Sequence, residues 1–136
     1  DHPHAQRAAG AALRNLAAEG TRRLEVISAI ARLPEYVVPE VASGLSAGRV
    51  GVRVATADAL ASMRHPRASS ELARALRDED PSVRAAAITG FAKLGTPAVG
   101  RTIAAMRHTD PDEGVRRRAE LACVRHGWAS GPLARP

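Results

Sequence analysis

Apolar residues recur at intervals of three and four positions along most of the chain. Between positions 81 and 94 they form one stripe, made of Val83, Ala86, Ala87, Gly90, Phe91 and Leu94. This spacing places apolar side chains on one face of a helix. Prolines, glycines and acidic residues between such stretches predict where helices start and stop. The pattern predicts eight helices, at residues 5–18, 22–33, 37–45, 50–63, 69–77, 81–94, 98–107 and 113–126.

A sequence motif repeats along the chain with a nearly constant period. Residues 80–87 contain Asp-Pro-Ser-Val-Arg, and weaker copies contain Val52-Arg53 and Val115-Arg116. The three Val-Arg pairs are 31 and then 32 residues apart, and Thr21-Arg22 continues the register upstream. A period of this size is typical of stacked helix pairs. We therefore predict an all-α protein, an α-solenoid forming a single repeat domain. Its units are predicted at residues 5–33, 34–63, 66–94 and 97–126, with 127–136 as a tail or the start of a further repeat.

The composition is typical of closely packed helices with small contact residues. Apolar residues make up 45% of the 136 residues, but alanine dominates them, and the aromatic residues are Tyr36, Phe91 and Trp128. A run of about 18 apolar residues, as a membrane span requires, is absent. The first residues lack the basic and apolar regions of a signal peptide, so we expect a cytoplasmic protein without a membrane partner. The single cysteine, Cys123, is expected to be a small buried apolar group.

The segment from 76 to 94, Leu-Arg-Asp-Glu-Asp-Pro-Ser-Val-Arg-Ala-Ala-Ala-Ile-Thr-Gly-Phe-Ala-Lys-Leu, resembles the HEAT-like repeats of the phycobilisome-lyase type. The resemblance covers residues 20–127 and is most specific within this segment. It implies a right-handed α-superhelix whose second helices line the concave side. It also implies that aspartate and arginine form a ladder of hydrogen bonds between repeats. The residues at the matching positions are Asp80, Arg84, Arg53, Arg116 and Arg22.

The second unit departs from this pattern, because Gly48 and Arg49 replace the acidic residue and proline that begin the third unit. The resemblance therefore leaves a ladder contact in the second unit open. A few members of the family attach bilins, whereas most are binding modules. No residue of this chain points to bilin chemistry.

Positive charge gathers near the C-terminal end of the chain. The net charge is +6, and nineteen of the twenty basic residues are arginine. The arginines form no basic stripe through the array, but four of them lie in the last predicted helix, at positions 116, 117, 118 and 125. Three interpretations stay open: a solvated capping repeat, a docking site for an acidic partner or nucleic acid, and a point where a further repeat follows. The candidate partner-binding residues are Arg117, Arg118, Arg125, Trp128 and Arg23.

The sequence contains no recognisable catalytic or metal-binding constellation. No two histidines have the i, i+4 spacing of a helical metal pair. The acidic run at residues 78–80 is better explained as a helix cap and solvated turn than as acid–base chemistry. A glycine-rich phosphate loop is also absent, so we predict no catalytic residue, no metal and no cofactor. Trp128 either stacks on a ligand or plugs the last repeat, and we favour the plug.

These observations predict a non-catalytic scaffold that binds a protein partner on its concave face. The main alternative is a nucleic-acid-associated module that binds phosphate through arginine. A subunit of a lyase-type enzyme complex is the residual hypothesis. The pattern does not identify the partner, and it leaves the oligomeric state open.

Overall fold

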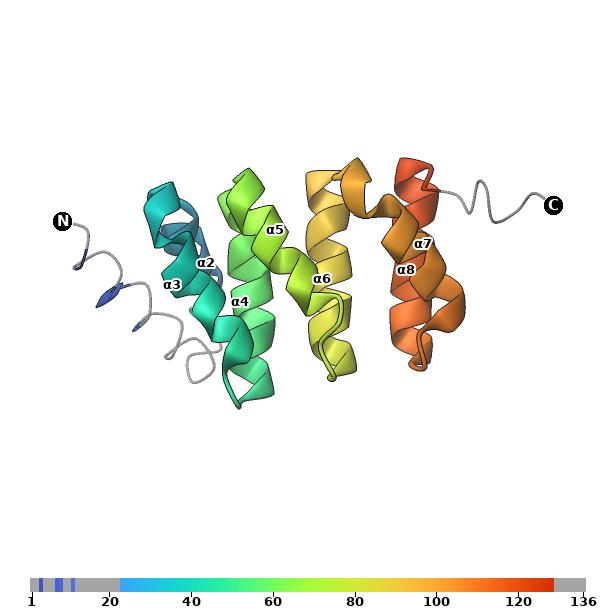
Figure 1. Ribbon diagram of the computed structural model, residues 1–136, viewed down its shortest axis with the longest axis horizontal. Helices are drawn as coiled ribbons and strands as arrows, with labels where there is room; N and C mark the ends of the chain where they lie inside the picture. Colours follow the sequence, from blue (N-terminus) through green and yellow to red (C-terminus); the bar gives the residue numbers. More distant parts are fainter. Residues whose placement is uncertain (1–2, 4–6, 9–10, 12–22, 129–136) are drawn as a thin grey trace.

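The structure is a computed structural model, and it describes residues 3, 7, 8, 11 and 23–128. Residues 23–128 form a row of helices joined by short turns (Figure 1). The α-helices are α2 (Arg23–Ala31), α3 (Val38–Ala42), α4 (Val50–Met63), α5 (Pro66–Ala75), α6 (Pro81–Leu94), α7 (Gly100–Thr109) and α8 (Glu113–His126). Short 3-10 helices are η2 (Glu35–Val37), η3 (Ser43–Ser46) and η4 (Pro97–Val99).

Three predicted helices have the bounds that the structure gives to α4, α6 and α8. The other predictions differ by a few residues at their ends. Helix α5 starts at Pro66 rather than at residue 69, because proline suits the first helical position, where its missing amide is not needed. The segment predicted as one helix at 37–45 is divided between α3 and the 3-10 helices beside it. The predicted helix 5–18 lies almost entirely outside the described residues.

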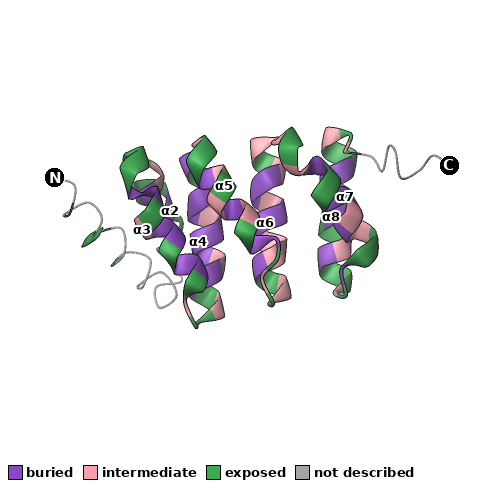
Figure 2. Cartoon of the chain, viewed as in Figure 1, coloured by how far each residue is buried: buried purple, intermediate pink, exposed green. Residues whose placement is uncertain are grey.

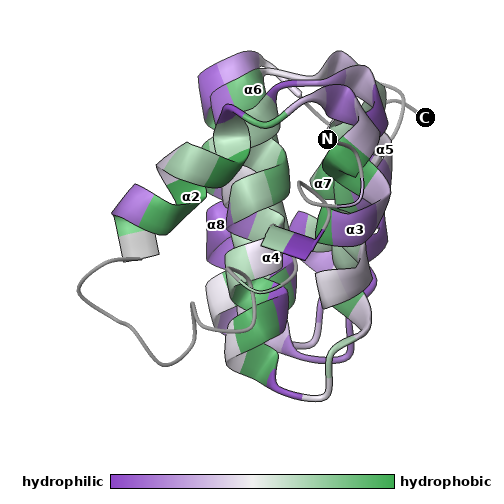
Figure 3. Ribbon diagram, turned by 90° about the vertical axis from the view of Figure 1, so that its left-hand side faces the viewer, coloured by the Kyte–Doolittle hydropathy of each residue, from purple (hydrophilic) through white to green (hydrophobic). Residues whose placement is uncertain are grey.

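The helices form two layers, which Figure 3 shows from one end of the stack. One layer contains α2, α4, α6 and α8, each packed against the next. The other layer contains α3, α5 and α7, which pack against α4, against α4 and α6, and against α8 respectively. Helices α4, α6 and α8 each follow their partner from the other layer after a short turn. We therefore call α2, α4, α6 and α8 the second helices and their layer the second layer. The described part of the chain is therefore an all-α solenoid, as the repeat period predicted.

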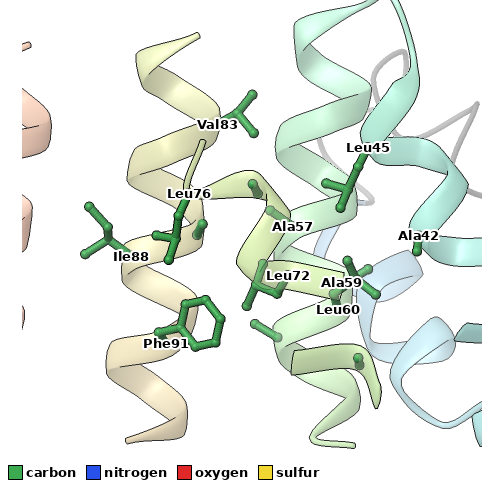
Figure 4. Close-up of a cluster of buried hydrophobic side chains, with 14 of the residues drawn as sticks. Ala42, Leu45, Ala57, Ala59, Leu60, Leu72, Leu76, Val83, Ile88 and Phe91 are labelled. Carbon is green, nitrogen blue, oxygen red and sulfur yellow. The ribbon is translucent and has the colours of Figure 1, made fainter. Parts of the chain in front are cut away.

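The core runs through the stack where the two layers meet (Figure 2). The apolar stripe predicted for residues 81–94 faces inward in α6, where Phe91 is almost fully buried, and Leu60 of α4 is equally buried. In Figure 4, Phe91 and Leu72 point toward each other between α6 and α5. Burying a side chain of this size contributes about 1.5–3 kcal/mol. Because this core is continuous from unit to unit, each helix pair stabilises its neighbours.

Small residues bring α4 and α6 close together. A Cβ atom built on Gly90 would lie 2.8 Å from the Cβ of Ala61 and 3.2 Å from a methyl carbon of Leu72. Real Cβ atoms do not approach another carbon so closely, so a larger residue at position 90 would push the two helices apart. Small residues such as Ala61 and Gly90 therefore allow the short distance between neighbouring second helices.

Local signals fix the ends of the second helices. Asp80 precedes α6 and its carboxylate accepts a hydrogen bond from the amide of Ser82 at 2.8 Å, while Asp112 does the same for Val115 at the start of α8. Gly95 and Gly127 end the two helices in the left-handed conformation, with φ of 64° and 69°. No helix in the described part of the chain is long and apolar enough to cross a membrane.

Candidate protein-interaction surfaces

The arginine in the first turn of α6 joins two neighbouring repeats. Arg84 donates from Nε and Nη2 to the two carboxylate oxygens of Asp110, at 2.8 and 2.9 Å. Its Nη1 donates to the carbonyl oxygens of Asp78 and Glu79, at 2.9 and 3.1 Å. The guanidinium therefore holds the turn of its own unit and the turn of the next unit together. A bidentate arginine–carboxylate pair adds geometric specificity to its strength.

Arg53 of α4 makes the same set of contacts one repeat earlier. Its Nε and Nη2 donate to the carboxylate of Asp78 at 3.0 and 3.3 Å, and its Nη1 donates to the carbonyls of Ala47 and Gly48. The Gly48-Arg49 turn does not prevent this contact, because Nη1 binds backbone carbonyls, which any residue supplies. A two-step ladder thus runs along one edge of the described stack.

Burial and hydrogen bonding act in opposite directions on the ladder carboxylate Asp110. Burial is the largest influence and raises its pKa, since the side chain is only 4% exposed. The hydrogen bonds from Arg84 and from the amide of Asp112, together with the positive charges of Arg84 and Arg116, outweigh burial, so the pKa of Asp110 lies below its ordinary value. The hydrogen bond to Asp110 in turn raises the pKa of Arg84. Both groups are therefore charged in the folded protein at neutral pH.

The ladder carboxylates are Asp78 and Asp110, which the sequence analysis did not assign. Asp80, which the resemblance placed in the ladder, is instead the N-cap of α6. The physical reason is the path of the chain in the turn between α5 and α6. There Oδ1 of Asp78 accepts a hydrogen bond from the amide of Asp80 at 2.9 Å, and the Asp78 carboxylate binds Arg53 of the preceding repeat. A signal was present, because Asp78 and Asp110 are 32 residues apart and each lies six residues before a ladder arginine.

Arg116 occupies the ladder position of α8. Its Nη1 donates to the carbonyl of Asp110 at 2.8 Å, as the equivalent atoms of Arg53 and Arg84 do in their own turns. Arg22, the fourth arginine in this register, lies outside the described residues, and so does the side chain of Arg23. The structure thus brings three of the predicted ladder arginines to one edge.

The predicted partner-binding residues near the C-terminal end do not form one patch. Arg117 is exposed and pairs with Glu113 of the same helix at 3.4 Å. Arg118 crosses to the neighbouring helix and donates to the hydroxyl of Thr89 at 2.8 Å. Arg125 is exposed near the other end of α8. The arginines therefore serve different contacts although they are close in sequence.

Trp128 lies at the end of the last described unit and is half-buried. Its ring stacks on His126 with 4.7 Å between the ring centres, and His126 also contacts the carbonyl of Ala92 in α6. The indole covers Gly100 so closely that a Cβ there would lie 2.9 Å from its carbons. These contacts are those of a side chain that closes the gap between α7 and α8.

A hollow of about 190 Å³ opens on the face of the second helices, and we name it the second-helix hollow. Helices α2, α4 and α6 line it with the residues Leu24, Ile27, Asp58, Ala61, Ser62, Arg64, Thr89, Gly90 and Lys93. Leu24 is 79% exposed at its rim. The floor is made of small residues, because Ala61 and Gly90 meet there. The hollow therefore offers depth, an apolar rim and cationic groups in one place.

A larger groove of about 690 Å³ lies where α4 and α6 end and α5 begins. Its lining includes Phe91, Leu94, Pro97 and Ser70. Arg64 is shared with the second-helix hollow. The groove is more apolar than the hollow and belongs to the edge of the stack rather than to the face of the second helices.

Reactive chemistry is not assembled on either surface within the described residues. Cys123 is buried, and this burial raises the pKa of its thiol. The described residues contain no group of three or more His, Cys, Asp or Glu side chains that could hold a metal ion.

Comparison with known proteins places the chain in a family. A search of curated proteins finds no match for this sequence. The family model for HEAT repeats matches residues 38–123, the region that contains α3 to most of α8. This match spans more than half of the chain and agrees with the two-layered stack and its ladder. The chain therefore belongs to the HEAT-repeat family, whose members commonly mediate contacts between proteins.

Proposed function

We propose that this chain is a non-catalytic scaffold that binds a partner protein on the concave side formed by its second helices. The observation that carries the proposal is the second-helix hollow with the exposed Leu24 at its rim. An exposed leucine next to a hollow is a typical place for a partner's apolar anchor side chain, because burial of few central residues supplies most binding energy.

The charges around the second-helix hollow suggest the chemistry of the partner segment. Arg64 and Lys93 are among its lining residues and carry positive charge, and Asp58 is an acidic residue of the same lining. A segment with one apolar anchor followed by an acidic residue would place the anchor in the hollow and the acid near Lys93. Such exposed charge pairs mainly increase the rate and specificity of association.

Two exposed serines on opposite layers provide a matched test of this surface. Ser62 lies on α4 beside the second-helix hollow, whereas Ser70 lies on α5 beside the larger groove. A photo-crosslinking amino acid is placed at either position, and adducts are collected from cells and identified by mass spectrometry. We expect a discrete protein adduct from position 62 that Leu24→Glu abolishes. An adduct from position 70 alone would move the binding site to the larger groove and contradict the proposal.

Nucleic-acid binding is the second candidate function, and the exposed arginines of α8 favour it. The structure weakens this candidate, because Arg117 pairs with Glu113 and Arg118 is bound to Thr89. Phosphate binding predicts affinity for labelled DNA that falls steeply between roughly 50 and 200 mM salt. The test is fluorescence anisotropy of duplex and single strands across that range, with Arg117→Glu/Arg125→Glu as the charge-reversed control. Tight, salt-sensitive binding that this double substitution removes would favour nucleic acid over a protein partner.

The closer relationship to the phycobilisome-lyase type remains a prediction, and so do the residual role in a lyase-type enzyme complex and the cytoplasmic location. Both the proposed scaffold role and the family membership are compatible with a lack of catalysis, since solenoids present surfaces rather than enclosed sites. The proposed function therefore includes no cofactor and no metal.

A further inference from the structure

The larger groove at the edge of the stack combines an apolar wall with one basic side chain. Phe91 and Leu94 line it from α6, and Pro97 and Val99 line it from η4. Arg64 lines it from the C-terminal end of α4. None of the described residues that line the groove is acidic. Its volume of about 690 Å³ is within the range of ligand-binding sites, so the groove is large enough to hold part of another molecule.

Arg64 occupies a backbone position that favours glycine. It ends α4 in the left-handed conformation, with φ of 56°, and no other non-glycine residue in the described part of the chain has a positive φ. At the repeat period, the positions that end α6 and α8 in this conformation are Gly95 and Gly127. A residue with a Cβ atom is strained there, so glycine at position 64 would give a more stable helix end. Such strain is found mainly at functional sites, and it indicates a binding role for Arg64 rather than a structural one.

The guanidinium of Arg64 has no partner within the described part of the chain. It is exposed, and it forms no hydrogen bond or ion pair there. Glu71, which follows the lining residue Ser70, is already paired with Arg74 at 2.8 Å. A carboxylate from another molecule would therefore meet a cation whose donors are all available. A guanidinium binds a carboxylate with two parallel hydrogen bonds, so the charge of this groove is complementary to an acidic side chain.

The geometry points to a second docking site, in the larger groove, for a partner protein segment in which an acidic side chain is followed by apolar residues. The carboxylate binds Arg64, and the apolar side chains pack on Phe91 and Leu94. The hydroxyls of Ser69 and Ser70 line the same groove and are available to the backbone of the segment. This site goes beyond the proposed function, because the groove lies at the edge of the stack and the second-helix hollow lies on the face of the second helices.

A nucleic acid suits the groove less well than an acidic peptide segment. Arg64 is the only arginine or lysine among its described lining residues. Phosphate backbones are bound by several cations together, and an apolar wall contributes little to them. The same wall is favourable for a peptide, because its apolar side chains leave water when they bind.

The test uses the full chain and two short peptides that differ in one group. Acetyl-Glu-Ser-Leu-Ser-Leu-amide carries the carboxylate, and acetyl-Gln-Ser-Leu-Ser-Leu-amide has nearly the same shape without the charge. Each peptide is titrated into the isotope-labelled chain while the backbone amide signals are followed by NMR. We expect saturable shifts at Phe91, Leu94 and Val99 with the Glu peptide, and at least about fivefold weaker binding of the Gln peptide. Equal affinities, or no saturable shift with either peptide, would overturn the inference.

The substitution Arg64→Gly separates binding from folding, because it should change the two in opposite directions. We expect the melting temperature to rise by about 2–4 °C, since glycine relieves the left-handed helix end. Affinity for the Glu peptide should fall to that of the Gln peptide. The matched control is Arg49→Gly, which removes an exposed arginine from the other end of α4, where glycine is tolerated as an N-cap, and it should leave binding unchanged. Full affinity in Arg64→Gly would contradict a role of this arginine in docking.

Two further results distinguish this site from the proposed function. Leu24→Glu, which should abolish the adduct at position 62, should leave the peptide shifts in the larger groove unchanged, because Leu24 does not line it. Peptide shifts confined to Ile27 and Ala61 would place the segment in the second-helix hollow, which would overturn this inference and leave the proposed function standing. Displacement of the Glu peptide by a single-stranded DNA oligonucleotide would assign Arg64 to phosphate binding and also overturn it.

Discussion

Removing the Arg84 side chain should destabilise the fold far more than removing an exposed arginine. Arg84 makes four hydrogen bonds, two to Asp110 and two to the carbonyls of Asp78 and Glu79. In Arg84→Ala the Asp110 carboxylate stays buried without its cation. Breaking a buried pair in this way costs about 3–5 kcal/mol. Because 11% of the Arg84 side chain is exposed and water reaches this edge, we expect the lower end, about 3 kcal/mol.

The assay is urea unfolding followed by far-UV circular dichroism, with Arg117→Ala as the matched control. Arg117 also pairs with a carboxylate, Glu113, but both side chains are more than 70% exposed. Exposed pairs of this kind contribute about 0.3–0.5 kcal/mol. The two substitutions remove the same number of atoms and the same charge, so the difference between them isolates the effect of burial and of the inter-repeat contact.

A double substitution decides whether the loss comes from the pair itself. Arg84→Ala/Asp110→Asn removes both charges, so it should be less destabilising than the sum of the single changes by at least about 1 kcal/mol. The reasoning is refuted if Arg84→Ala costs less than about 1 kcal/mol, or if the two single effects simply add. Either result would mean that the core alone, and not the ladder, holds adjacent units in register.

Three other predictions concern packing, pH and reactivity. Gly90→Val should destabilise the chain by about 1–3 kcal/mol in urea unfolding, because its side chain would collide with Ala61, whereas Gly48→Ala, with open space around it, should change stability by less than about 0.5 kcal/mol. Asp110 has a pKa lowered below 3.8 in the folded state, so its stabilising effect is present above this pH and is lost as the pH falls through the folded pKa. Acid unfolding should therefore be shallower below pH 3.8 for Asp110→Asn than for the unaltered chain, and equal slopes would contradict this assignment. Burial protects Cys123 and raises the pKa of its thiol, so Ellman's reagent should react at least about tenfold more slowly with the folded chain than with the chain in urea.

The sequence determined the helices of the second layer and the repeat that organises them. The bounds of α4, α6 and α8 follow from local signals, because caps such as Asp80 and left-handed glycines such as Gly95 act within a few residues. The first-layer helices were predicted less accurately, since segments such as η3 and η4 are short and their ends depend on packing against the neighbouring unit. Periodicity also predicted which faces are buried, because a solenoid core is made mostly of contacts between adjacent units.

The tertiary structure decided which charged groups meet. Arg84 and Asp110 are 26 residues apart, and their contact depends on the spacing and rotation of two helix pairs, which no local pattern encodes. Residues 78–80 are all acidic, and the sequence alone does not say which of them binds an arginine. The path of the chain in the turn places Asp78 in the ladder and Asp80 at the cap of α6. In the same way, folding gave the adjacent residues Arg117 and Arg118 different partners and placed Trp128 against Gly100. Local order can therefore be read from the sequence of this protein, whereas its ladder and its exposed surfaces exist only once the repeats are stacked.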